Sequence, residues 1–326
     1  MARTPSYFSG LAQAPGAGFW GQIKFLPFLI SPFRKIWCDP TNGSDFNDGS
    51  SLQKAFATLS AAYAAATAGM NDTIVLVGDG TSSGTARVDS AFTWAKNSTH
   101  LVGICAGQLF SQRARIAPTS STTAFANFFT VSAEDCLFQN IQWFHDFATD
   151  TTNQIALTVS GGRNVFKNCH IAGIAKGDDA GGRSLLISGT SGENTFEDCV
   201  IGIDTVDRST TNASVEFQGG CPRNVFRNCL FPFRATNSGV LGIKVAAASA
   251  SDRFQVFDSC IFMNHNTTMT ALCDLAASMG GYLLFNNPCL VRISGFGGDA
   301  TDRDQIYVAG AVGNAGTSGL AVAPTA

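Results

Sequence analysis

The stretch Val165-Phe166-Lys167-Asn168-Cys169 decides how this chain folds, because variants of it recur along the middle of the sequence. Every copy has phenylalanine in second place. Most copies have Asn or Asp in fourth place and Cys in fifth place. The other copies are LFQNI at 137–141, TFEDC at 195–199, VFRNC at 225–229, VFDSC at 256–260 and, more loosely, LFNNP at 284–288.

Successive copies are separated by 28, 30, 30, 31 and 28 residues, measured between their phenylalanines. A fixed period of this size is typical of repeat proteins. Within each copy, apolar residues also stand three and five positions after the phenylalanine. No copy contains an amphipathic helical stretch, which excludes helical and leucine-rich solenoids. The pattern predicts a β-solenoid in which each repeat is one coil and an Asn or Asp bends the chain between two short strands.

Coils of a β-solenoid stack about 4.8 Å apart, so equivalent side chains lie above one another. The sequence therefore predicts two ladders inside the solenoid. The phenylalanine ladder comprises Phe138, Phe166, Phe196, Phe226, Phe257 and Phe285, and the cysteine ladder comprises Cys169, Cys199, Cys229 and Cys260. The variable stretches 146–153, 173–183 and 204–212 are expected to be loops that leave one edge.

The composition limits the classes of function. Only 14% of the 326 residues are charged and the net charge is −3, so nothing favours binding to nucleic acid or to an anionic membrane. A surface with so little charge suits a particle that is partly buried against other copies. Ten cysteines without zinc-like spacing are expected to be reduced core residues. The N-terminus does not resemble a signal peptide, and no apolar run is long enough for a transmembrane helix.

Residues 1–36 are rich in aromatic residues, proline and glycine and do not resemble a folded unit. Two interpretations remain open. The segment either folds back along its own solenoid or docks its aromatic side chains on neighbouring subunits, and the second interpretation is slightly favoured. The candidate partner-binding residues of this arm are Phe8, Phe19, Trp20, Phe25, Phe28 and Phe33.

Residues 37–77 combine a Gly- and Asp-rich turn, the passage AFATL at 55–59, an Ala-rich helix expected over 52–68, and a buried strand at 73–77. This passage resembles the N-terminal cap of the pectate-lyase-like, right-handed parallel β-helix superfamily, although Ala55 stands where that superfamily usually has proline. The resemblance covers about residues 37–295. It implies an all-β, single right-handed parallel β-helix whose open end is covered by a capping helix.

Further strands are expected at 101–105, 115–117 and 128–131. Together with the six motif copies they predict about nine coils and a rod about 40 Å long. The predicted organisation is an arm (1–36), a β-helix domain (37–296) and an irregular Gly- and Ala-rich tail (297–326). The tail is expected to be either disordered or a strap on a partner.

Enzymes of this superfamily need acidic residues around the scissile bond or around calcium. The candidates here are Asp178, Asp179, Asp204, Asp207, Arg208 and Glu216. They fall in or beside irregular loops, and neighbouring coils would bring Asp179 near Asp207. No catalytic signature accompanies them, so no catalytic residue is assigned.

Oxygen donors in the turn at 39–48 favour calcium and Asx turns equally, so that alternative stays open. The four histidines are isolated in the sequence, and alternation along a strand points Cys169 and His170 to opposite faces. No metal or cofactor is assigned.

Three functions are compatible with these observations. The favoured one is a non-enzymatic structural protein of a tailed-phage virion, a trimeric decoration (cement) protein that is made in the host cytoplasm and bridges major capsid protein subunits on the capsid surface. The trimer is implied by the resemblance to phage members of the superfamily. The alternatives are a tailspike or tail-fibre component that binds or cleaves host polysaccharide, and a polysaccharide lyase or hydrolase.

Overall fold

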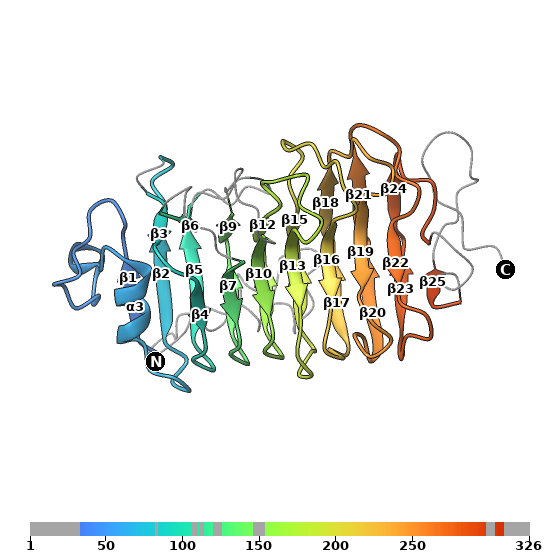
Figure 1. The fold of residues 1–326 in the computed structure, drawn as a ribbon. Helices are drawn as coiled ribbons and strands as arrows, with labels where there is room; N and C mark the ends of the chain where they lie inside the picture. Colours follow the sequence, from blue (N-terminus) through green and yellow to red (C-terminus); the bar gives the residue numbers. More distant parts are fainter. Residues whose placement is uncertain are drawn as a thin grey trace, which may run out of the picture.

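A computed structural model describes residues 33–81, 84–105, 110, 114–119, 126–145, 154–297 and 304–309. The chain winds as a parallel β-solenoid with three sheets (Figure 1). Sheet A contains β1 (Lys35–Cys38), β2 (Thr73–Val77), β5 (His100–Ile104), β8 (Leu137–Gln139), β11 (Val165–Lys167), β14 (Thr195–Glu197), β17 (Asn224–Arg227), β20 (Arg253–Asp258), β23 (Gly281–Asn286) and β25 (Ile306–Ala309).

The two other sheets follow from the same winding. Sheet B contains β3 (Ala86–Val88), β6 (Arg115–Pro118), β9 (Gln142–Phe144), β12 (His170–Ala172), β15 (Val200–Ile201), β18 (Leu230–Phe233), β21 (Ile261–Asn264) and β24 (Cys289–Val291). Sheet C contains β4 (Phe92–Trp94), β7 (Asn127–Val131), β10 (Ile155–Val159), β13 (Arg183–Ile187), β16 (Ala213–Phe217), β19 (Leu241–Val245) and β22 (Cys273–Leu275).

Each described turn of the solenoid runs through sheets A, B and C in that order. Sheet C has seven strands, so seven turns contribute a strand to all three sheets. The prediction of nine coils was therefore too high. In the described part of the chain, strands at the two ends, such as β1 and β25, join sheet A without partner strands of the same turn in both other sheets.

The repeated phenylalanines lie in register in the middle of sheet A, as the motif predicted. Phe166 pairs with Phe138 on one side and with Phe196 on the other, and both neighbouring pairs of rings are parallel within 8°. The distances between ring centroids along the ladder are 4.8, 4.6, 4.8, 4.7 and 5.0 Å from Phe138 to Phe285. These rings are at most 1% exposed and form part of a single core inside the solenoid.

The bend after each phenylalanine has a left-handed backbone. The residues in fourth place of the motif have φ between 47° and 57°: Asn140, Asn168, Asp198, Asn228, Ser259 and Asn287. Asn and Asp adopt this conformation more readily than other residues with a side chain. At each bend the backbone N–H donates to a carbonyl of the next coil, as Asn168 does to Glu197 at 2.9 Å. The motif thus encodes both the bend and its link to the next coil.

The cysteine column lies inside the solenoid immediately after this bend. The Sγ of Cys199 donates to the carbonyl of Phe166 in the preceding coil at 3.4 Å, and its neighbours in the column repeat this contact. None of the ten cysteines forms a disulfide. Burial raises the pKa of the Cys169 and Cys229 thiols, so these residues behave as small apolar core residues.

The helix near the N-terminus is shorter than predicted. Residues Leu52–Lys54 form a 3₁₀ helix, and helix α3 covers only Leu59–Ala65. The chain between them is drawn into a β-bridge, which pairs Phe56 with Cys38. The side chain of Thr58 then accepts a hydrogen bond from the Ala61 N–H at 3.1 Å and starts the helix there.

The described part of the predicted tail, residues 297 and 304–309, contains a strand, β25. Strand β25 pairs in parallel with β23 and extends sheet A, with Phe285 opposite Val308. The Gly- and Ala-rich composition of the surrounding region concealed this short strand, although its own residues Ile306, Tyr307 and Val308 have high β-propensity. None of the helices in the described part of the chain is long and apolar enough to cross a membrane.

Candidate functional site

The acidic residues predicted as catalytic candidates lie on two neighbouring loops and on β16. The loops are stacked in successive coils, since the Ser209 N–H donates to the Gly177 carbonyl at 3.0 Å. The contact is close enough that a Cβ atom on residue 177 would lie 1.7 Å from the Asp207 carbonyl oxygen, so only glycine fits. The solenoid therefore brings the candidate loops together, as coil stacking predicted.

Glu216 is the most buried of these acids. It lies on β16 opposite Leu186, and its carboxylate forms an ion pair with Arg183 from β13. The two side chains are only 7% and 6% exposed. Gln218 donates a further hydrogen bond to the same carboxylate, and Arg183 also donates to the carbonyls of Ala180 and Gly182. A buried ion pair held in this way stabilises one conformation of the loop, and the Glu216 carboxylate stays bound to Arg183 and Gln218.

Asp179 holds the start of β10 to its own loop. Its two carboxylate oxygens accept hydrogen bonds from the backbone N–H groups of Gln154 and Gly181, each at 3.0 Å. The backbone carbonyl of Asp179 accepts from the side-chain amide of Asn212 at 3.1 Å. Each oxygen of this carboxylate therefore already has a donor within the fold.

Arg208 is enclosed by neutral groups. Its guanidinium donates to the side chain and backbone carbonyl of Asn212, to the Ser214 hydroxyl and to the Leu241 carbonyl, at 2.7 to 3.0 Å. Its ring partner is Phe233, whose centroid lies 5.5 Å away. Burial, and then the positive charge of Arg183, lowers the pKa of Arg208 to about 9. This side chain closes the 204–212 loop onto β16 and is 2% exposed.

The remaining candidate acids form ion pairs near the surface. Asp207 pairs with Arg234 at 2.7 Å, and Asp204 lies 3.6 Å from His265. Asp178 lies 3.9 Å from Lys176. Among the residues that the structure describes, no hydrogen bond joins any two of these carboxylates. The described contacts use these side chains to hold the loops in place.

The turn at 39–48 uses its acidic side chains to bind backbone. Asp39 accepts from the N–H groups of Thr41 and Asn42, at 3.0 and 3.1 Å. Asp45 accepts from the N–H groups of Ala57 and Thr58, each at 2.9 Å. Of the two interpretations left open by the sequence, this geometry favours Asx-type turns. Within the described ranges, no three His, Cys, Asp or Glu side chains are grouped in a way that could hold a metal ion.

A polar row on the outer face of sheet B was not anticipated. Arg115 on β6 donates to the Gln142 side chain at 2.7 Å, and Gln142 donates to Nδ1 of His170 at 3.1 Å. His170 then contacts the Gly202 carbonyl through Nε2 at 3.0 Å. Arg115 also lies over the ring of Phe144, 5.0 Å from its centroid. The signal was present in the sequence, because residues 142 and 170 hold equivalent places in two successive repeats.

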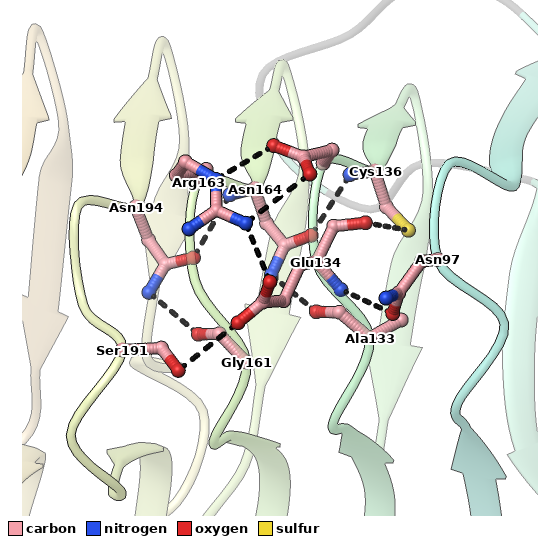
Figure 2. Close-up of polar contacts among 10 residues, drawn as sticks. Asn97, Ala133, Glu134, Cys136, Gly161, Arg163, Asn164, Ser191 and Asn194 are labelled. Atoms are coloured by element: carbon pink, nitrogen blue, oxygen red, sulfur yellow. Dashed lines mark hydrogen bonds and ion pairs between the residues drawn. The ribbon is translucent and has the colours of Figure 1, made fainter. Parts of the chain in front are cut away.

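Figure 2 shows a second network missed by the sequence interpretation, an asparagine column at the other corner of sheet A. The side chain of Asn164 accepts from the Cys136 N–H at 2.9 Å, and Asn194 accepts from the Asn164 N–H at 3.0 Å. Asn224 and Gln255 continue the column in the next coils. The spacing was visible as an Asn two places before the phenylalanine in three successive repeats.

Beside this column, charged side chains face the solvent. Arg163 binds both Glu134 and Asp135, and Glu134 also accepts from the Ser191 hydroxyl at 3.2 Å (Figure 2). Along sheet A, Lys167 lies 3.3 Å from Glu197, and Arg227 lies 3.3 Å from Asp258. Alternating signs in adjacent coils favour one register of stacking, although each exposed pair contributes only about 0 to 1 kcal/mol.

We predict that Asn194→Ala destabilises the fold by about 2 to 3 kcal/mol, because it removes the partners of buried backbone groups at about 1 to 3 kcal/mol each. The affected groups are the Asn164 N–H and the Gly161 carbonyl, which the Asn194 side chain binds at 3.0 and 3.1 Å. Urea unfolding followed by circular dichroism measures the loss. Asn237→Ala, on an exposed loop, is the matched control, and an equal loss in both variants would contradict a special role for the column.

The arm residues predicted to bind a partner lie mostly outside the described residues. Phe8, Phe19, Trp20, Phe25 and Phe28 fall within 1–32, and their interaction with a partner stays a prediction. Phe33 is described and is 43% exposed, directly before β1.

Comparison with known proteins shows likeness at the level of the fold. No family model and no curated protein matches the chain. Among solved structures, the chain is similar to pectin methylesterase PemA from Erwinia chrysanthemi, with 18% identity over 85% of this chain and 81% of the other, at a TM-score of 0.47. It is also similar to the pectate lyase Pel9A, with 14% identity over 84% of this chain and 74% of the other, at a TM-score of 0.46.

Proposed function

We propose that this chain is a non-enzymatic structural protein of a phage virion, a homotrimeric decoration protein that bridges major capsid protein subunits on the capsid surface. The observation that carries this proposal is that the candidate carboxylates already form hydrogen bonds or ion pairs with other groups of the chain. Asp179 and Glu216, the two acids bound most completely, serve backbone amides and a buried arginine. An acid used in this way holds a loop in place and is poorly suited to proton transfer.

The proposed mechanism is mechanical. Ring stacking at 4.6 to 5.0 Å and a continuous core make the solenoid a stiff rod. Such a rod, attached across the boundary between two shell subunits, adds buried area that is lost when the subunits separate. The aromatic residues of the arm, from Phe8 to Phe33, would supply the attachment. Neither nucleic acid nor a membrane is needed as a partner.

We also infer that α3 caps the N-terminal end of the solenoid. Its buried residues Leu59 and Ala62 belong to the same core as Ile36 and Ile74 of the first strands. A solenoid end exposes apolar side chains and unpaired backbone, and covering it blocks end-to-end association.

A tail component that binds host polysaccharide is the second candidate. The observation that favours it is Arg115, which lies over the Phe144 ring on the outer face of sheet B, 5.0 Å from its centroid, where both residues are only half-buried. A charged group beside an aromatic ring is suited to sugar recognition, since the ring covers an apolar sugar face while the guanidinium binds hydroxyls or carboxylates.

Incubation with bacterial exopolysaccharide, pectin and alginate separates the structural role from an enzymatic one. We expect no new reducing ends and no unsaturated product, because the candidate acids are engaged within the fold. Turnover by the intact protein that Asp179→Ala or Asp207→Ala abolishes, with the fold retained by circular dichroism, would overturn the proposal and favour the polysaccharide alternative. A binding signal without turnover would favour a tail component.

The number of copies per virion distinguishes the capsid from the tail. Quantitative mass spectrometry of purified particles should find hundreds of copies if the protein decorates the capsid. A handful of copies would place it in the tail and contradict the decoration role.

A further inference from the structure

The loop after β1 is held rigidly at nearly every residue. The Ser44 N–H and the Asn47 side chain both donate to the Ala55 carbonyl at 2.9 Å. The Gly49 N–H donates to the backbone carbonyl of Lys54 at 2.8 Å. A Cβ atom on Gly43 would lie 2.3 Å from the Phe56 carbonyl oxygen, so the loop is also closely packed at its start. Its conformation is therefore fixed before any partner arrives.

Phe46 projects from this fixed loop with a relative exposure of 103%, the highest among the exposed large apolar side chains of the described chain. The residues on both sides of it are bound. The Asp45 carboxylate accepts three hydrogen bonds, from the Ala57 and Thr58 N–H groups and the Thr58 hydroxyl, at 2.8 to 2.9 Å. By contrast, Phe56 is turned into the core and is 8% exposed. The chain thus buries Phe56 in the core and exposes Phe46 to solvent.

The position of the loop connects it with the aromatic arm. Strand β1 is the outermost strand of sheet A, and the loop leaves it at the N-terminal end of the rod (Figure 1). Phe33, the last aromatic residue of the arm, precedes β1 and is 43% exposed. The 32 residues before it carry Phe8, Phe19, Trp20, Phe25 and Phe28. Phe33 and Phe46, both exposed, therefore precede and follow β1 at one end of the rod.

This end has little net charge. Residues 33–58 contain three basic residues, Arg34, Lys35 and Lys54, and three acidic residues, Asp39, Asp45 and Asp48, so their formal charges sum to zero. Asp79, which accepts a hydrogen bond from the Thr41 hydroxyl of the loop at 2.6 Å, adds one negative charge. The loop also satisfies its acids internally, as for Asp39 and Asp45. A partner of this end has little charge to recognise, and burial of apolar side chains is the remaining source of affinity.

We propose that Phe46 is the anchor of a docking surface at the N-terminal end of the rod, and that it inserts into an uncharged apolar socket on a capsid subunit. The inference rests on the proposed virion role and names the contact by which that role is carried out. A large rigid aromatic side chain that is already positioned loses little entropy on binding, which is why such residues dominate interface energies. The arm then extends the contact beyond the socket.

The test uses the full chain, and its probe is purified virions of the phage whose genome encodes it, grown without a functional gene for this chain so that its sites are empty. Binding of fluorescently labelled chain is measured by co-sedimentation for the original protein and for Phe46→Ala. We expect Phe46→Ala to weaken attachment about thirtyfold, the ratio that corresponds to an interface anchor worth about 2 kcal/mol. Its melting temperature should not change, because Phe46 lies outside the core. Ile261→Ala, which removes another exposed apolar side chain on β21, near the other end of the rod, should leave attachment unchanged.

The possible outcomes distinguish a failure of the Phe46 docking surface from a failure of the proposed virion role. If the original protein attaches and Phe46→Ala attaches equally well, the docking surface is wrong while the virion role stands. If the original protein does not attach to virions at all, the virion role fails, and the capsid as partner fails with it. An affinity that falls steeply between low and high salt would contradict an uncharged socket.

Discussion

Replacing Phe196 by alanine should destabilise the solenoid by about 3 to 5 kcal/mol, the usual cost of truncating a fully buried phenylalanine. Phe196 is 0% exposed and stacks on Phe166 and Phe226 at 4.6 and 4.8 Å. The substitution removes ring contacts with both neighbouring coils at once. A coil of a repeat protein has only these neighbours to stabilise it, so the damage falls on both interfaces of that coil.

Guanidinium unfolding followed by circular dichroism measures this loss as a fall in the midpoint. Phe196→Leu should cost less than about 1.5 kcal/mol, because it keeps most of the buried volume. Phe46→Ala is the matched control, since the same chemical change at a fully exposed position should stay within about 0.5 kcal/mol. A loss of similar size in both alanine variants would show that the ladder is not what holds the coils together.

Stability should fall as the pH drops from about 6.5 to about 4, because His100 and His170 are buried in neutral form. Burial lowers the pKa of both imidazoles to about 4. Three smaller effects act on the pKa of His170. The hydrogen bond to the Gly202 carbonyl raises this pKa, the positive charge of Arg115 lowers it, and the negative charge of Asp204 raises it. Nδ1 of His100 accepts the Leu137 N–H at 3.0 Å. Protonation of that nitrogen would replace the hydrogen bond with a repulsive contact between two donors.

The sign follows from the order of the two pKa values. The folded-state value near 4 is lower than the unfolded-state value near 6.5, so above pH 6.5 neither state binds a proton and the histidines impose no cost. Between pH 6.5 and 4 only the unfolded state binds them. Each histidine then contributes a slope of about 1.4 kcal/mol per pH unit, and about 3 kcal/mol over the whole window. Below pH 4 the loss from these two groups levels off.

Chemical unfolding at a series of pH values tests this expectation. His100→Gln and His170→Gln should each remove about 1.4 kcal/mol per pH unit from the slope between pH 4 and 6.5. Asn237→Ala, on an exposed loop, is the control and should not change the slope, since neither side chain titrates. Aspartates with a lowered pKa, such as Asp258, act only below about pH 4 and do not overlap this window. A slope unchanged in both buried-site variants would refute the neutral histidines.

The sequence alone determined the solenoid, because a period of 28 to 31 residues is a property of spacing that needs no distant contact to be recognised. It also determined the inward phenylalanine column and the position of the bend at residues such as Asn168. The bend is a local preference of Asn and Asp for left-handed backbone, which the sequence records directly.

Only the tertiary structure decided what the polar side chains do. Asp179, Arg208 and Glu216 are grouped in the sequence like candidates for catalysis, yet stacking of two loops gives their charged groups backbone amides, neutral oxygens and Arg183 as partners. The same limit applies to the helix start, where Asp45 fixes Thr58 across the loop. The spacing of residues along the chain determines the period at which coils stack. The partner of a buried polar group depends instead on which loops come into contact, and that is determined by packing in three dimensions.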